Sequence, residues 1–164
     1  MNALVSKAAK LHALEVRILE KLQSPLLLLI RLYWGWQFFQ TGWGKIMNLE
    51  RTAGFFATLG LPAPKLNALM AGGTEAFGGL LLLVGLGSRV VTIPLCFTML
   101  VAYATAHRDA VKKIFEDPDG FVTQAPFLFL FASVIILVFG PGWLSADYLI
   151  GKKTAHDPER ATRV

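Results

Sequence analysis

Residues 66–86 read LNALMAGGTEAFGGLLLLVGL, and this stretch decides the fold. Its only charged side chain is Glu75. A helix rises about 1.5 Å per residue, so a segment of this length crosses the roughly 30 Å hydrocarbon layer of a bilayer. The sequence therefore predicts a membrane-spanning helix with a carboxylate near its middle.

Three further apolar segments accompany this one, at about residues 26–46, 90–106 and 125–139. Sequences rich in glycine and proline separate them, as expected for the turns between spans. Only 16% of the whole chain is charged and 54% is hydrophobic, whereas a typical soluble domain carries about 25% charged residues. We therefore predict an all-α membrane protein in which residues 25–150 form a four-transmembrane-helix bundle.

The predicted bundle has three accessory segments. Residues 1–24 alternate apolar and basic side chains at helical spacing, with Leu11 and Ile18 on one arc. This pattern predicts an amphipathic helix in the membrane interface, with a solvated helix packed on a partner as the alternative. A second short interfacial helix is expected between the first two spans, and residues 151–164 are predicted to be a polar C-terminal tail.

The charged residues outside the spans bear on partners and orientation. The net charge of +5 arises from Lys and Arg scattered beside apolar runs, not from one basic stripe, so nucleic-acid binding is not expected. With four spans, nine of these basic residues fall on the side of the termini and six on the other. The excess predicts that both termini are cytoplasmic.

Glu75 is the most informative residue, because an acid in the middle of a span is too deep to reach water. Its helix face carries Ala68, Gly72 and Gly79, and small residues allow a neighbouring helix to approach closely. Glu75 is therefore expected to point into the bundle. An intramembrane carboxylate marks a functional site by default, although a packing ion pair or a permanently protonated acid remains an alternative.

The first span contributes two cations. Arg31, Gly35, Phe38, Gly42 and Lys45 share one face of the predicted helix, and glycines on a charged face indicate contact with another helix. The alternative for Arg31 is that its side chain extends to the nearby membrane surface.

Two ionisable residues lie at the ends of spans. His107 ends the third span and Asp147 follows the fourth, and each could equally be an interfacial residue or a helix cap. If the spans alternate in direction, these two residues join Arg31, Glu75 and Lys45 in one polar seam through the bundle. Such a seam could pass protons or hold the head group of a hydrophobic ligand.

Four stretches resemble the DoxX family of bacterial membrane proteins: RLYWGWQFFQTGWGK (31–45), FFATLGLP (55–62), EAFGGLLLLVGL (75–86) and GPGWLSAD (140–147). Arg89 and His107 also fit, and the resemblance covers about residues 25–150. It implies a four-helix fold in the bacterial inner membrane. It also implies a redox setting, because relatives include a subunit of thiosulfate:quinone oxidoreductase and proteins associated with sulfur metabolism and oxidative stress.

We weigh three functions on this basis. The first is a redox component that passes electrons from a sulfur- or thiol-handling partner to membrane quinone, with Glu75, Arg31 and His107 as catalytic candidates. The quinone would also contact Lys45, Trp34, Tyr103 and Asp147. The second is a non-catalytic anchor for soluble redox enzymes, and the third is a small-solute transporter, which would require an oligomer.

Other cofactors find little support in the sequence. The chain has one cysteine, Cys96, and three histidines, of which two lie in the terminal segments. A dithiol pair is therefore excluded and an intramembrane bis-His haem is not expected. No metal-ligand spacing is present, so no metal site is predicted. The small-residue faces would serve contacts between copies equally well, so a homo-oligomer stays open.

Overall fold

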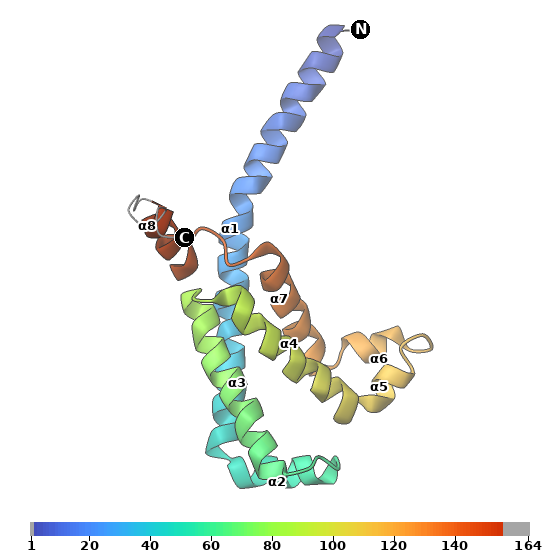
Figure 1. The fold of residues 1–164 in the computed structure, drawn as a ribbon. Helices are drawn as coiled ribbons and strands as arrows, with labels where there is room; N and C mark the ends of the chain where they lie inside the picture. Colours follow the sequence, from blue (N-terminus) through green and yellow to red (C-terminus); the bar gives the residue numbers. More distant parts are fainter. Residues whose placement is uncertain (1, 156–164) are drawn as a thin grey trace, which may run out of the picture.

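The computed structural model describes residues 2–155, and in this range every regular element is a helix (Figure 1). The helices are α1 (Asn2–Met47), α2 (Leu49–Thr58), α3 (Pro64–Val84), α4 (Ser88–Thr105), α5 (Arg108–Lys112), α6 (Pro118–Val122), α7 (Ala125–Phe139) and α8 (Ala146–Ala155). The all-α prediction is confirmed for the described chain.

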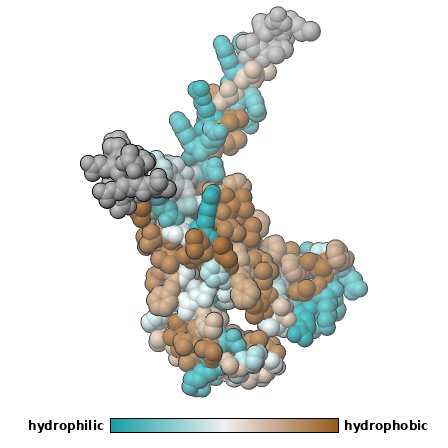
Figure 2. All heavy atoms as spheres, in the orientation of Figure 1, coloured by the Kyte–Doolittle hydropathy of each residue, from teal (hydrophilic) through white to brown (hydrophobic). Residues whose placement is uncertain are grey.

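Two helices, α3 and α4, are long and apolar enough to cross a membrane, and α7 is a shorter apolar helix of 15 residues. Figure 2 shows a mostly hydrophobic middle of the molecule, with hydrophilic surface on the projecting part of α1 and near α5 and α6. This distribution is the one expected of a protein that sits in a bilayer. Crossing by the second half of α1 and by α7 stays a prediction.

The predicted spans agree with the helices within two residues at each end, except at the start of the first. There the structure has one helix of 46 residues, in which Pro25 lies inside and does not end the helix. Residues 7–23 are all exposed and project beyond the rest of the molecule (Figure 1). The predicted boundary between residues 24 and 25 is therefore not a break in the helix.

The closest helix pair is α1 with α3, and glycines make it close. A Cβ added to Gly42 would lie 2.6 Å from the carbonyl oxygen of Gly72 and would overlap the backbone of Ala76. Gly35 and Gly79 make the same kind of close backbone contact at a second point along the two helices. Small residues let two backbones approach in this manner, so α1 and α3 form one tightly packed unit, on which α2 also packs.

The second closely packed pair is α4 with α7. The two pairs meet around a core cluster of buried side chains, Phe38, Leu82, Leu95, Met99 and Ile136, four of which are completely buried. Beyond this cluster, α3 and α4 diverge from the turn that joins them (Figure 1). Side chains of α2, α3, α4 and α7 line a cavity beyond the cluster.

The remaining helices close the two ends of the bundle. The connection between α4 and α7 contains α5 and α6, and α6 is held to α4 because the Tyr103 hydroxyl donates to the carbonyl of Phe121 at 2.9 Å. At the opposite end, α8 extends through residues 146–155, so the first part of the predicted C-terminal tail is helical. The rest of that tail lies outside the described residues.

Candidate functional site

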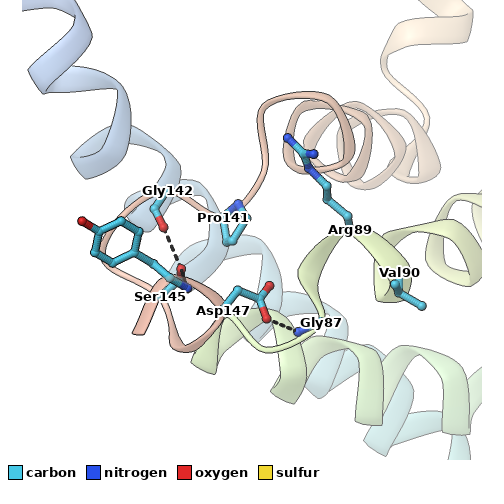
Figure 3. Close-up of a pocket in the computed structure, with 8 residues that line it drawn as sticks. Gly87, Arg89, Val90, Pro141, Gly142, Ser145 and Asp147 are labelled. Carbon is cyan, nitrogen blue, oxygen red and sulfur yellow. Dashed lines mark hydrogen bonds between the residues drawn. The ribbon is translucent and has the colours of Figure 1, made fainter. Parts of the chain in front are cut away.

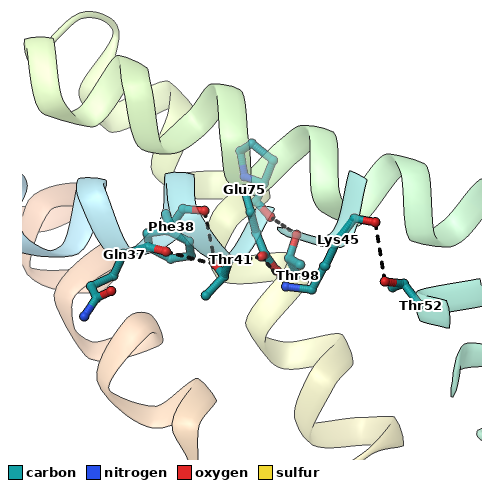
Figure 4. A network of polar contacts seen from close by, with 8 residues as sticks. Gln37, Phe38, Thr41, Lys45, Thr52, Glu75 and Thr98 are labelled. Carbon is teal, nitrogen blue, oxygen red and sulfur yellow. Dashed lines mark hydrogen bonds and ion pairs between the residues drawn. The ribbon is translucent and has the colours of Figure 1, made fainter. Parts of the chain in front are cut away.

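Glu75 lies in the interior of the bundle, with 2% of its side chain exposed. Its Oε2 atom accepts a hydrogen bond from the Thr41 hydroxyl at 3.1 Å and forms an ion pair with Nζ of Lys45 (Figure 4). Both partners come from α1, which the glycine contacts hold against α3. The predicted inward orientation of Glu75 is confirmed, and of the two cations that the first span contributes, Arg31 and Lys45, it is Lys45 that pairs with Glu75.

This ion pair forms part of the wall of a cavity of about 690 Å³. That volume falls within the roughly 300–1,000 Å³ typical of small-molecule sites, which are also mostly apolar with a few polar groups. The lining comes from α1, α2, α3, α4, α7 and adjoining turns, and its apolar side chains include Phe55, Phe56, Leu59, Met70, Phe97, Val101 and Phe129. The charged and apolar parts of the wall together fit an amphiphilic ligand.

Further polar groups lie along the same cavity wall. Thr98 lies near Glu75 in Figure 4 and lines the cavity from α4. Thr105, His107 and Asn67 line it close to the ends of their helices. His107 is half-buried, and its ring centroid is 6.1 Å from that of Tyr103. The structure thus brings three predicted residues, Glu75, Lys45 and His107, to one cavity.

Arg31 occupies a different place, on α1 but 14 residues before Lys45 and outside the cavity lining. Its side chain is completely buried, and its Nη2 donates to the carbonyl oxygen of Leu144. The guanidinium lies against Gly85, where a Cβ would overlap it. Its Nε and Nη1 atoms are buried without a hydrogen-bond partner in the described chain. The alternative interpretation, in which the Arg31 side chain extends to the membrane surface, is therefore wrong.

Asp147 lies beside Arg31, and its side chain binds the backbone of the turn between α3 and α4. Its carboxylate accepts hydrogen bonds from the backbone N–H groups of Gly87 at 2.6 Å and Ser88 at 2.9 Å (Figure 3). These groups belong to the start of α4, where a negative charge is favourable. The arrangement matches the capping role that the sequence left open for Asp147. It joins the segment after α7 to the bundle.

A shallow pocket of about 390 Å³ lies at this end of the molecule, lined by residues that include Arg89, Pro141, Asp147 and Tyr148 (Figure 3). In Figure 3 the Arg89 side chain points away from Asp147 and toward the end of α7. There its Nη2 donates to the carbonyl of Val138 at 3.3 Å. The polar groups of this pocket are thus engaged with the backbone of the protein.

The predicted single seam is consequently divided into two separate polar sites. The core cluster lies between the Arg31–Asp147 site and the Glu75–Lys45 site. Large apolar side chains fill the space that the seam would need, and the helix-face pattern does not reveal this. Four of the seam's charges therefore lie two at each end of the core cluster: Arg31 and Asp147 at one end, and Lys45 and Glu75 at the other.

The two predicted aromatic contacts lie outside the cavity lining. Trp34 packs edge-to-face on Phe129, with ring centroids 5.0 Å apart, and Phe129 in turn lines the cavity. Tyr103 stacks on Phe121 at 4.5 Å. Sequence reasoning missed Thr41 and Thr98 as polar members of the wall. Thr41 lies one turn before Lys45 on α1, and this spacing could have indicated it.

Comparisons with known proteins show which sequences the chain is similar to. The model of the DoxX family matches residues 26–108. A Bacillus subtilis (strain 168) protein named "Putative oxidoreductase CatD" is 30% identical over 131 residues, which cover 79% of this chain and 91% of that protein. A Mycobacterium tuberculosis (strain ATCC 25618 / H37Rv) protein named "Uncharacterized membrane protein Rv3486" is 29% identical over 144 residues, 84% of this chain and 88% of that protein.

No solved structure matches the chain. The family model covers half of the chain, from the start of the first apolar segment to the first residue of α5, and so includes Arg31, Lys45, Glu75 and His107. On these matches, the chain belongs to the DoxX family of membrane proteins.

Proposed function

We propose that this protein is the membrane component of a redox system and that it binds a lipid-soluble quinone in the cavity beside Glu75. The observation that carries the proposal is the composition of the cavity wall. The wall contains the ion pair of the buried Glu75 with the partly exposed Lys45, several threonine hydroxyls, and aromatic and aliphatic side chains from α2, α3, α4 and α7. A quinone has the matching parts, a polar ring and an apolar tail.

The geometry assigns roles to individual residues. Lys45 is 29% exposed and has N–H groups to spare beyond the one directed at Glu75, so it is placed to donate to a quinone carbonyl. Glu75 holds Lys45 in position. Reduction of a quinone takes up electrons and protons in equal number, and a buried carboxylate with a neighbouring ammonium group is suited to supplying the protons.

The electrons would come from a partner protein, of a kind that handles sulfur compounds, thiols or another reductant. The name of the Bacillus subtilis relative points to the same class of activity. In the proposed arrangement, α1, α3, α4 and α7 all cross the bacterial inner membrane and α2 lies in the head-group region. Both termini then face the cytoplasm.

The alternative proposal, a membrane anchor for soluble enzymes, is favoured by one observation. Residues 7–23 of α1 are exposed, with Leu11, Leu14 and Ile18 between 50% and 68% accessible. An apolar stripe on a projecting helix is suited to contact with another surface. The two proposals are compatible, because a redox component also needs a site for its electron donor.

The test is quinone binding by the purified protein in mild detergent, measured by extraction of co-purified quinone and by titration with a short-chain quinone analogue. The double variant Lys45→Met/Glu75→Gln removes both charges from the cavity wall. We expect its affinity to fall about tenfold or more, because a hydrogen bond to a charged group contributes about 1.5–3 kcal/mol and 1.4 kcal/mol corresponds to about tenfold.

The chain offers a matched control in a second Lys–Glu ion pair. Lys65 and Glu50 make the same kind of contact, but their side chains are 64% and 79% exposed. The variant Lys65→Met/Glu50→Gln changes the total charge identically and should bind quinone as the unaltered protein does. An absence of bound quinone together with equal analogue binding by all three proteins would refute the proposed function.

A further inference from the structure

We propose that the cavity beside Glu75 exchanges water and protons with one side of the membrane only, the side on which α2, α5 and α6 lie. The side that carries the exposed part of α1 and α8 is sealed from it. The proposal concerns access to the site, and its consequence for proton supply rests on the proposed function.

The first observation is where the residues of the cavity wall come from. Several lie at or beside helix ends on the α2 side: Asn67 in the first turn of α3, Thr105 at the end of α4, His107 between α4 and α5, and Pro126 at the start of α7. On α1 the lining begins only at Thr41, ten residues beyond Arg31. The cavity therefore extends from the level of Glu75 toward one surface.

The second observation is what lies beyond Glu75 in the other direction. Phe38, Leu82, Leu95 and Ile136 have no exposed surface, and none of them lines the cavity. These four side chains come from α1, α3, α4 and α7, so every helix of the bundle contributes to the barrier. Close-packed apolar side chains leave no room and no hydrogen-bond partners for a chain of water molecules.

The third observation is that the two charged residues beyond this barrier, Arg31 and Asp147, bond to backbone groups at their own end of the bundle. Arg31 donates to the carbonyl of Leu144, and the Asp147 carboxylate accepts from two backbone N–H groups. Neither residue lines the cavity. A proton relay requires groups that can be reached from both directions, and the Arg31–Asp147 site offers none to the cavity.

On the open side, polar side chains of the cavity wall lead from Glu75 toward α5 and α6. From Glu75 outward, the wall offers Lys45, Thr98, Thr105 and His107 before the ends of the helices are reached. Protons that a reaction at Glu75 consumes would thus come from the solution that bathes α5 and α6. They would not come from the solution around the termini.

Access can be measured with single cysteines and a charged, membrane-impermeant thiol reagent in sealed vesicles of each orientation. The native Cys96 is first replaced by serine. Lys112→Cys on α5 and Tyr148→Cys on α8 then mark the two sides, since both positions are exposed. The reporters are Thr98→Cys and Thr105→Cys, both on the cavity wall.

We expect both reporters to react in the vesicle orientation in which Lys112→Cys reacts, and to be protected in the orientation in which Tyr148→Cys reacts. Reaction of Thr98→Cys from the Tyr148 side, from both sides, or from neither would overturn the proposal. The labelling needs no quinone and no partner protein. Its result can therefore be interpreted even if the protein proves not to bind quinone. Circular dichroism and elution in gel filtration check that each variant is folded.

Discussion

The two buried charged sites of this protein, one at each end of the core cluster, differ in what satisfies their charges. At one end, Arg31 and Asp147 bond to backbone groups of residues 144, 87 and 88. At the other end, Glu75 is held by the side chains of Thr41 and Lys45 on the wall of a cavity. The first site joins parts of the chain, whereas the second places its charged side chains on the wall of a cavity.

The difference shows that an ionisable residue inside a membrane protein is not by itself evidence of chemistry. Both sites carry charges that are costly to bury and must be satisfied. Only the Glu75 site combines a side-chain ion pair with accessible volume. A charge bonded to backbone groups is fixed by the fold, whereas two side chains can rearrange around a ligand. The predictions below test this contrast.

The largest effect is expected for Gly85→Ala at the Arg31 end. Gly85 ends α3 with φ +75°, a conformation that costs other residues about 1 kcal/mol or more. The added Cβ would also overlap the Arg31 guanidinium and lie 2.7 Å from Cβ of Ser145. We expect loss of the folded protein, seen as aggregation in gel filtration. A variant that folds with unchanged thermal stability would show that Arg31 is not packed as described.

Gly73→Ala is the matched control for that substitution. Gly73 lies in the interior of α3, and a Cβ there would meet nothing within 4 Å. Alanine is a better helix former than glycine, by about 1 kcal/mol. We expect Gly73→Ala to fold with equal or slightly higher thermal stability.

An intermediate effect is expected at the cavity site from Lys45→Met. Removal of one partner leaves the Glu75 carboxylate buried with one hydrogen bond from Thr41, and breaking a buried pair costs about 3–5 kcal/mol when both groups are enclosed. Because Lys45 is 29% exposed, we expect the lower part of that range or less. Thermal unfolding in detergent measures it.

Addition of Glu75→Gln to Lys45→Met should restore much of the lost stability, because no uncompensated charge remains. The double variant would then be stable but poor at binding quinone, which separates the two properties. If the double variant were as unstable as Lys45→Met alone, the Lys45–Glu75 ion pair would serve to hold the fold together, as the bonds of Arg31 do.

The smallest effect is expected from Asp147→Asn. Asparagine retains one acceptor for the N–H groups of Gly87 and Ser88, and it is a good capping residue itself. The loss of charge near the start of α4 should cost about 1 kcal/mol or less. The melting temperature should fall by a few degrees with quinone binding unchanged. Reduced binding without a change in stability would mean that the two sites communicate.

Much of the fold could be predicted from the sequence, because apolar segments, breakers and helix faces are local properties. The faces containing Arg31 and Lys45, and Ala68 and Glu75, are buried as expected. Pro25 was less informative, since a proline near the start of a span can begin a helix or lie within one. The structure has the second arrangement.

The candidate site was only partly predictable, since a helix face gives direction around the axis but not level along the bundle. Arg31 and Lys45 share a face, yet 14 residues separate them, which is about 21 Å of helix. Which of them meets Glu75 depends on the register of α1 against α3, and that register follows from Gly42 meeting Gly72. The sequence likewise suggests Tyr103 as a ligand contact, whereas in the structure its ring stacks on Phe121. A helix-face pattern does not reveal a ring partner on another helix.

The uninterrupted course of α1 has a mechanical consequence. Its 46 residues correspond to a rod about 69 Å long, which carries the exposed residues 7–23 at one end and Lys45 at the other. A regular helix resists twisting, so a rotation imposed on the exposed end would turn the Lys45 ammonium group relative to α3. A movement of the exposed end of α1 would thereby change the position of Lys45 beside the Glu75 carboxylate, with no loop between the two ends.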